Sequence, residues 1–469
     1  MAHAIVIGLG KSGIAAARLL QHHGWQVTVS DRGDGDALQP IKQTLEQEGI
    51  AVQLGQDLTP NPSIARIIVS PGVPWDSPTL VHARALGIEV MGEMELAWQA
   101  LRTVPWIGVT GTNGKTTVTS LIEAIFTAAG CWAPACGNIG RAACEIALEG
   151  ITAARSPDWI IAEISSYQIE ASETLAPKIG LWTTFTPDHL NRHITLDRYY
   201  WIKAQLLLRS QQQILNGDDA NLQQHMADWP DAAWTATGQI KANQTEERGK
   251  DDPKPDRPEA MPPEPFAYIE ADWVWARGTK ILPVDAISMP GHHNLQNVLM
   301  AVAAAHLAGI APEAIAKGIK TFPGVPHRLE QVIHWQDITF INDSKATNYD
   351  AAEVGLRSVA GPVILIAGGD PKVGKDGPWL AQIQSKVAVV LLIGDAAPAF
   401  AERLDQIGYH SHKSVATLDV AVPLAAKLAQ TLNAKTVLLS PACASFDQYR
   451  SFEHRGDHFR QLCQGVLDP

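Results

Sequence analysis

The sequence predicts three α/β domains in succession, each with a mainly parallel sheet and helices on its faces. Two observations predict this class. Short apolar runs of strand length alternate with helix-like segments along the whole chain. A chain of 469 residues also exceeds one ordinary hydrophobic core, so two or three domains are expected. No internal repeat is visible, which argues against a solenoid or a propeller.

The first domain is expected over residues 1–99. Its apolar and helix-like runs follow the βαβ pattern of a parallel sheet. The expected elements are a strand at His3–Ile7, a helix at 12–23, strands at 25–30 and 65–70, and a helix at Glu93–Leu101. The boundary follows at Thr103-Val104-Pro105.

The central domain is expected over residues 100–324 and the last over residues 325–469. The expected central elements are a strand at Trp106–Thr110, a helix at 115–129, a strand at 159–164 and a helix at 294–307. In the last domain, strands are expected at 338–341, 363–367, Val387–Ile393 and Thr436–Leu439. Residues 245–265 are rich in proline and charge and poor in packing residues, which predicts a mobile insertion without a catalytic part.

Composition excludes several classes of function. The formal net charge of −12 argues against nucleic acid as the main partner, because phosphate backbones require a basic face. The five cysteines form no CxxC pair, which favours free thiols in a reducing cytosol. The chain shows no leader pattern and no apolar run of membrane-spanning length. We therefore expect a soluble, cytoplasmic protein without a membrane partner, and a monomer.

A glycine-rich turn between the strand at Trp106–Thr110 and the following helix predicts a phosphate-binding loop. Its residues are Gly111, Thr112, Asn113, Gly114, Lys115, Thr116 and Thr117. Glycines let backbone amides approach phosphate oxygens, a lysine reaches the terminal phosphates, and a threonine hydroxyl binds Mg²⁺. Val109 stands where the strict spacing has glycine, so the loop is a variant. The alternative is a strand–turn–helix corner with chance glycines.

Two further signals suit a nucleotide site. Glu163 ends the buried strand WIIAE, where an acid faces the crevice of a parallel sheet and can hold Mg²⁺. The alternative is an exposed carboxylate at a strand end. Near the start, Gly8, Gly10, Ser12 and Gly13 lie in GLGKSG, and Asp31 ends the second strand. This pattern suits a dinucleotide or the diphosphate of a UDP-sugar. It leaves open a nicotinamide-dependent dehydrogenase, or a tight turn without a ligand.

Other polar residues are ambiguous by themselves. His189 reads as a structural histidine, and Lys203 as a lysine that extends along an apolar surface. In the last domain, polar clusters at 342–347, 368–372 and 440–446 each follow an apolar strand. Three clusters on one rim predict a substrate pocket, in which Lys345 and Lys372 suit an anionic amino acid. The alternative is ordinary helix capping by Asp343 and Ser445.

Taken together, these motifs resemble the Mur ligase family over nearly the whole chain. The loop TGTNGKTT, the segments GNIG at 137–140 and GHHNLQN at 291–297, and the runs NDSKATN at 342–348 and SPACASFDQ at 440–448 carry the resemblance. It implies a Rossmann-like first domain, a P-loop ATPase-like centre and a Rossmann-like last domain. The best match within the family is its D-glutamate-adding branch.

The resemblance also implies roles for individual residues. Metal ligands would be Thr116, Glu163, His189 and a carbamylated Lys203. The catalytic residues would be Lys115, Glu163, His189 and Lys203. ATP would be bound by the loop with Asn294, Asn297, Arg328 and Asp343. The UDP-sugar would contact Gly8, Gly10, Ser12, Gly13, Asp31, Ser70, Gly72, Asn138 and Ser165. D-Glutamate would be surrounded by Lys345, Thr347, Lys372, Ser445 and Phe446.

The reaction implied by the resemblance is the ligation of D-glutamate to UDP-N-acetylmuramoyl-L-alanine. It would use ATP, pass through an acyl phosphate and require two Mg²⁺ ions. Three alternatives are a sibling ligase or folylpolyglutamate synthase with another amino acid, a nicotinamide-dependent dehydrogenase, and a non-catalytic nucleotide-binding module.

Overall fold

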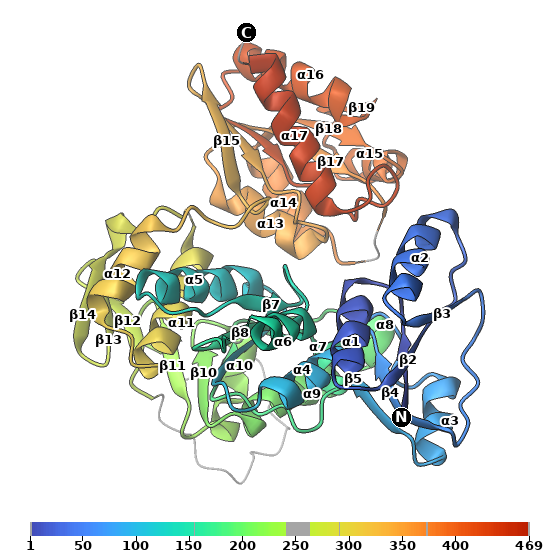
Figure 1. The fold of residues 1–469 in the computed structure, drawn as a ribbon. Helices are drawn as coiled ribbons and strands as arrows, with labels where there is room; N and C mark the ends of the chain where they lie inside the picture. The colour runs from blue at the N-terminus through green and yellow to red at the C-terminus, as the bar shows by residue number, and fades with distance from the viewer. Residues whose placement is uncertain (1, 154, 241–262, 290, 372–373, 468–469) are drawn as a thin grey trace, which may run out of the picture. The chain divides into compact units, whose positions relative to one another are not determined.

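The computed structural model describes residues 2–153, 155–240, 263–289, 291–371 and 374–467 (Figure 1). Contacts divide the chain into two compact units. One comprises residues 1–287 with 295–322, and the other residues 288–294 with 323–469. The three sheets comprise five, nine and six strands, which confirms the predicted three-part α/β class.

A parallel sheet in the order β3-β2-β1-β4-β5 begins the chain. Its elements are β1 (His3–Ile7), α1 (Lys11–His22), β2 (Gln26–Asp31), η1 (Asp36–Leu38), α2 (Gln39–Gln47), β3 (Ala51–Leu54), β4 (Ile64–Val69), α3 (Pro78–Ala85) and β5 (Glu89–Gly92). The central strands β1 and β4 are rich in isoleucine and valine, as expected for strands that are covered on both faces of the sheet. Because the strand order reverses beside β1, a crevice opens at the carboxyl ends of β1 and β4.

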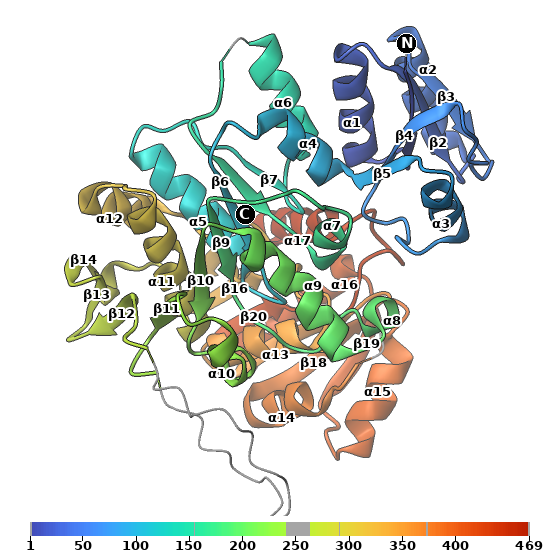
Figure 2. The same ribbon diagram turned by 90° about the horizontal axis from the view of Figure 1, so that it is seen from below.

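The central sheet has the order β14-β13-β12-β11-β10-β9-β6-β8-β7. Its elements are α4 (Glu93–Leu101), β6 (Trp106–Thr110), α5 (Lys115–Ala128), β7 (Ala135–Gly137), α6 (Ala143–Thr152), β8 (Ile160–Glu163), α7 (Ser166–Glu170), β9 (Ile179–Trp182), α8 (Leu190–His193), α9 (Leu196–Arg209), β10 (Gln212–Asn216), α10 (Ala220–Gln224), η2 (Met226–Asp228), β11 (Ala233–Ala236), β12 (Ala267–Glu270), β13 (Trp273–Ala276), β14 (Thr279–Pro283), η3 (Val284–Ala286), α11 (His292–Leu307) and α12 (Pro312–Thr321). Strands β6, β8 and β9 are buried along their whole length. Strands β12 to β14 add an antiparallel edge, visible beside α11 and α12 in Figure 2.

The second unit contains the third sheet, in the order β15-β16-β20-β17-β18-β19. Its elements are β15 (Glu330–Trp335), β16 (Ile338–Asn342), α13 (Tyr349–Ser358), β17 (Val363–Gly368), α14 (Gly377–Lys386), β18 (Val387–Ile393), α15 (Ala397–Gln406), β19 (His412–Ala416), α16 (Leu418–Thr431), β20 (Thr436–Leu439) and α17 (Phe452–Leu467). Only the β15–β16 pair is antiparallel among the strand pairs of this sheet in the described residues. The loops after β16, β17 and β20 therefore leave from the same edge.

Buried carboxylates of α4 join the first sheet to the central one. The side chain of Glu93 is buried, and its Oε1 accepts a hydrogen bond of 2.6 Å from the backbone N–H of Cys144, at the start of α6. Burial raises the pKa of Glu93 to about 7, and in the described region its Oε2 lacks a hydrogen-bond partner. The surroundings of Glu93 therefore favour the neutral form of its carboxyl group.

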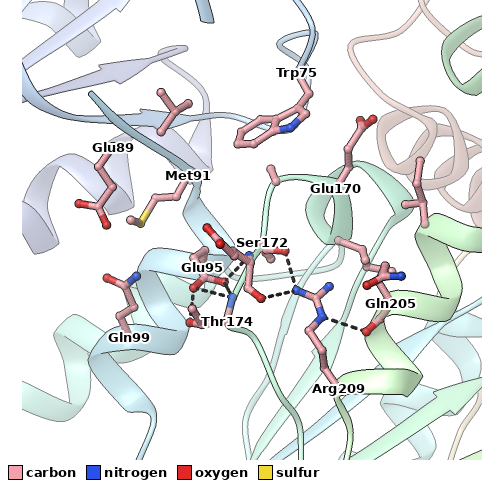
Figure 3. Close-up of a pocket in the computed structure, with 15 residues that line it drawn as sticks. Trp75, Glu89, Met91, Glu95, Gln99, Glu170, Ser172, Thr174, Gln205 and Arg209 are labelled. Atoms are coloured by element: carbon pink, nitrogen blue, oxygen red, sulfur yellow. Dashed lines mark hydrogen bonds between the residues drawn. The ribbon is translucent and has the colours of Figure 1, made fainter. Parts of the chain in front are cut away.

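Glu95, two residues further along α4, binds the segment that follows α7. Its carboxylate accepts from the backbone N–H groups of Thr174 and Leu175 at 3.1 Å. From the other side, Arg209 donates to the carbonyl oxygen of Ser172 at 2.6 Å (Figure 3). A cavity of about 530 Å³ lies at this joint, with Trp75 on its wall. None of the predicted site residues lines it.

Several boundaries match the sequence prediction and others were missed. The elements at His3–Ile7, Glu93–Leu101 and Trp106–Thr110 agree residue for residue. The prediction of a mobile insertion falls largely on residues 241–262, which lie outside the described residues. All five cysteines are free thiols, and Cys131 is the only partly exposed one among them. No helix within the described ranges is long and apolar enough to cross a membrane.

Candidate active site

The glycine-rich turn joins the end of β6 to the start of α5, as the phosphate-loop prediction requires. Gly111 has φ +148°, and a Cβ there would lie 2.0 Å from the hydroxyl of Thr183. Gly114 has φ +83°, and its Cβ would lie 2.6 Å from the Asn297 side-chain oxygen. Only glycine satisfies both constraints, so these residues shape the loop and bring Asn297 against it.

Thr184, which follows β9, is hydrogen-bonded to the backbone of the loop. The N–H of Asn113 donates to the Thr184 hydroxyl at 2.8 Å, and the N–H of Thr112 donates to the Thr184 carbonyl at 2.8 Å. The ammonium of Lys115 folds over the turn and donates to the carbonyl oxygens of Gly111 and Thr112, both at 2.9 Å. The Lys115 ammonium therefore lies at a loop whose backbone amides can bind phosphate.

Glu163 lies beside this loop, because β8 pairs with β6 and sets Glu163 opposite Val109. The carboxylate is 1% exposed. One oxygen accepts from the side-chain amide of Asn138 at 2.7 Å, and the other is buried without a hydrogen-bond partner in the described structure. A buried, unsatisfied carboxylate oxygen costs free energy unless a cation reaches it, so this atom fits a metal ligand.

Lys203, on α9, is buried against the same loop. Its Nζ donates to the Gly111 carbonyl at 2.9 Å and to the Thr110 hydroxyl at 3.3 Å, and lies 4.8 Å from the ring centre of Tyr199. Burial, and next the charge of Lys115, lowers the pKa of Lys203 well below its ordinary value. A lysine of lowered pKa is neutral more often, and the neutral amine is the nucleophilic form.

His189 directly precedes α8 and packs against Tyr167 and Tyr199. Its backbone has φ 54°, and its ring Nδ1 lies 3.1 Å from the hydroxyl of Tyr167 on α7. A capping box of Ser165 and Gln168 fixes the start of α7. The predicted residue Ser165 thus has a structural role in this helix start. Among the described residues no group of three or more His, Cys, Asp or Glu side chains converges as a metal cage.

The first sheet presents the second glycine turn at its crevice. A Cβ on Gly13 would lie 1.9 Å from the Gly8 carbonyl oxygen, and one on Gly8 would lie 2.6 Å from the Ser70 hydroxyl. The Asp31 carboxylate accepts from the N–H of Leu9 at 2.7 Å and from that of Gly33 at 2.8 Å. Asp31 therefore braces the glycine turn. A cavity of about 200 Å³ beside it is lined by Gly8, Asp31 and Gly72, among other residues.

In the second unit, the predicted residue Asp343 is buried and hydrogen-bonded. Its carboxylate accepts from the Ser440 hydroxyl at 2.8 Å and from the Leu329 N–H at 3.2 Å. Burial raises the pKa of Asp343 to about 7, although Arg328 opposes the shift. Arg328, Asp343 and Lys345 also line one small cavity with His293.

The loops after β16 and β20 are tied together by Arg455 of α17. This buried guanidinium donates to the carbonyl oxygens of Ser344 at 2.9 Å and of Cys443 and Ala444 at 3.0 Å. Sequence reasoning missed Arg455, because one arginine on a polar helix gives no signal of burial. It brings the segments with Lys345, Thr347 and Ser445 together.

The loops of this rim are followed by two phenylalanines, Phe446 and Phe452, which differ in their surroundings. Phe446 is 71% exposed, whereas the ring centre of Phe452 lies 5.2 Å from the Lys345 ammonium. Phe452 is therefore a rim residue that the prediction lacked. Lys372 lies outside the described residues.

The fold and the glycine loop define a nucleotide-binding α/β protein with its phosphate loop in the central sheet. Residues 2–92 match the profile described as Mur ligase MurD-like, N-terminal domain, and residues 109–305 match the Mur ligase middle domain. The chain belongs to the Mur ligase family, whose members are ATP-dependent ligases that form amide bonds. This membership sets aside the dehydrogenase alternative.

Similar proteins extend over the whole chain. A UDP-N-acetylmuramoylalanine–D-glutamate ligase of Microcystis aeruginosa is 58% identical, with 98% of this chain and 99% of that protein covered. One of the same name from Synechocystis sp. is 57% identical, with both chains covered completely. The solved UDP-N-acetylmuramate–alanine ligase of Thermotoga maritima covers 99% of both chains with a TM-score of 0.60 and 16% identity, which supports the fold alone.

Proposed function

We propose that this chain ligates D-glutamate to UDP-N-acetylmuramoyl-L-alanine with ATP, a step in making peptidoglycan precursor. The names of relatives 57–58% identical over nearly the full length support this substrate pair. The observation that carries the chemistry is the meeting of Lys115, Lys203 and Glu163 at one phosphate loop.

The reaction has two steps in this proposal. The L-alanyl carboxylate attacks the γ-phosphorus of ATP, which releases ADP and gives an acyl phosphate. The amine of D-glutamate then attacks the acyl carbon, phosphate leaves and the amine loses a proton, which gives the amide. Two anions must approach closely in the first step. Lys115, released from the Gly111 and Thr112 carbonyls, offsets the charge on the transferred phosphoryl group.

The proposed metal sites use side chains that can bind Mg²⁺ directly or after modification. The unsatisfied oxygen of Glu163 and the Thr116 hydroxyl would hold one Mg²⁺. The neutral amine of Lys203 would add CO₂ and lose a proton, and the resulting carbamate with His189 would hold a second. Mg²⁺ at these places would reduce the repulsion between the carboxylate and the triphosphate.

Substrate recognition is proposed from the three groups of predicted residues. The glycine turn with Ser12, Asp31, Ser70 and Gly72 would take the UDP-sugar, together with Asn138 and Ser165 of the central domain. Asn294, Asn297, Arg328 and Asp343 would contact ATP. Lys345, Thr347, Lys372, Ser445 and Phe446 would surround D-glutamate, and the chain would act as a monomer.

A direct assay tests the proposal. The protein is incubated with ATP, Mg²⁺, UDP-N-acetylmuramoyl-L-alanine and D-glutamate, and the product is measured by mass spectrometry. We expect the D-glutamyl amide and one phosphate for each product. L-Glutamate, L-alanine and a diamino acid are run in parallel to detect a sibling specificity. Lys115→Ala should reduce kcat by about 100-fold or more with an unchanged melting temperature. Product formed only with another amino acid would contradict the proposal.

A further inference from the structure

The segment that carries His189 is not secured by its own sequence. Helix α8 is four residues long, and helices of that length are unstable in isolation. The residue before it, His189, and the residue after it, Ile194, have φ values of 54° and 68°. Left-handed backbone is costly for a β-branched residue such as Ile194. Tertiary contacts must therefore hold this segment in place.

Two neighbouring residues of α7 supply contacts at both ends of α8. The Tyr167 hydroxyl lies 3.1 Å from Nδ1 of His189, with the two ring centres 5.2 Å apart. The Ser166 hydroxyl lies 2.9 Å from Nε2 of His193, a completely buried residue. The start of α7 therefore fixes the start and the end of α8.

Helix α7 is itself connected to Glu163, the proposed metal ligand. It begins directly after β8, which ends at Glu163, and the capping box of Ser165 and Gln168 satisfies its first N–H groups. Glu163 and Tyr167 are thus four residues apart, on a connection held by this capping box. The hydroxyl of Tyr167 extends that connection to His189.

We infer that Tyr167 is a positioning residue that orients the His189 imidazole toward a divalent cation through Nε2. A histidine that binds a metal through Nε2 carries its hydrogen on Nδ1, and it needs an acceptor there. The Tyr167 hydroxyl oxygen is that acceptor. The Asp188 carboxylate lies 3.5 Å from Nε2, on the side of the ring that would face the cation. The inference rests on the proposed metal role of His189.

The test compares Tyr167→Phe, His189→Asn and the double variant. Tyr167→Phe removes one oxygen and keeps the ring between His193 and Arg192. Mn²⁺ binding is titrated by electron paramagnetic resonance in the presence of the UDP-substrate and a non-hydrolysable ATP analogue. We expect Tyr167→Phe to weaken the second Mn²⁺ equivalent by about tenfold. In the double variant we expect no loss beyond that of His189→Asn.

Two controls separate orientation from general damage. Tyr268→Phe removes a hydroxyl from β12, an element remote in the sheet order, and should leave Mn²⁺ affinity unchanged. Ser166→Ala loosens the other end of α8 and keeps the Tyr167 hydroxyl, so its effect on Mn²⁺ affinity should be smaller.

The outcomes distinguish the inference from the proposed function. If His189→Asn leaves Mn²⁺ affinity unchanged, the metal role of His189 fails, and the inference fails with it. If His189→Asn weakens binding but Tyr167→Phe stays within twofold of the parent, only the inference is overturned. The inference would also be overturned if the double variant lost Mn²⁺ affinity by the product of the two single losses. Equal losses of Mn²⁺ affinity in Ser166→Ala and Tyr167→Phe would overturn it as well.

Discussion

Replacing Glu93 with glutamine should change how the stability of the first unit depends on pH. Glu93 is a buried carboxylate whose pKa rises from 4.5 to about 7 because burial disfavours its charge. The folded protein therefore holds this proton more tightly than the unfolded chain does. As pH rises from 4.5 to 7, the unfolded chain gives up the proton first and folding stability falls. The contribution is complete below pH 4.5 and absent above pH 7.

The size of the effect follows from the same numbers. At about 1.36 kcal/mol for each pH unit, the shift corresponds to about 3 kcal/mol. Glutamine cannot ionise, and its side-chain oxygen can still accept from the Cys144 N–H. The nearby thiols of Cys136 and Cys144 stay protonated because burial raises the pKa of each. Glu93→Gln should therefore gain about 2.5 kcal/mol over the parent between pH 5 and pH 8, because part of the loss has already occurred at pH 5.

Urea unfolding of parent and variant at four pH values measures this difference. Glu313→Gln removes an exposed carboxylate of the same unit and is the matched control. Asp343 also has a raised pKa, but it is present in both proteins and cancels in the comparison. An advantage of Glu93→Gln that is equal at pH 5 and pH 8 would refute the reasoning.

Three further predictions concern the active site. Gly111→Ala should destabilise the protein by about 1–3 kcal/mol and abolish ATP binding, as measured by urea unfolding and calorimetry, because the new Cβ meets the Thr183 hydroxyl; normal ATP binding would contradict the loop geometry. Lys203→Ala should lose most ligase activity and the carbamate ¹³C signal that the parent gives with ¹³C-bicarbonate, since its lowered pKa leaves a reactive amine; a parent without that signal would argue against carbamylation. Arg455→Lys should raise KM for D-glutamate by about tenfold or more in steady-state assays, because one ammonium cannot bridge three carbonyl groups; an unchanged KM would show that the two loops hold their places without it.

Local patterns were enough to predict the alternation of strands and helices. Strands such as β1 and β6 are apolar runs bounded by turn residues, so neighbours in the sequence define them. The glycine loop could be predicted for the same reason, because its shape depends on the residues within it. The hairpin of β12 to β14 was missed, since its short strands follow a segment without packing residues.

What the sequence could not reveal depends on contacts between distant residues. Lys203 could be read as a surface lysine, and only its contact with Gly111 shows that it is buried. Asn138 was predicted to contact the UDP-sugar, and no local pattern indicated that its amide also donates to Glu163, a contact that arises because β7 pairs with β8. From the sequence alone, Phe446 and Phe452 are equally plausible neighbours of Lys345. The side on which a loop residue emerges is set by backbone turns that no periodic pattern encodes.

The distribution of thiols gives this protein a ready attachment point for a reporter dye. Four cysteines are shielded inside the fold, while Cys131, just beyond α5, is partly accessible. Maleimide reagents attack the thiolate and need access, so labelling at mildly alkaline pH should select Cys131. The dye would sit at the opposite end of the helix that Lys115 begins. Nucleotide occupancy could then be followed by fluorescence without engineering a cysteine-free background.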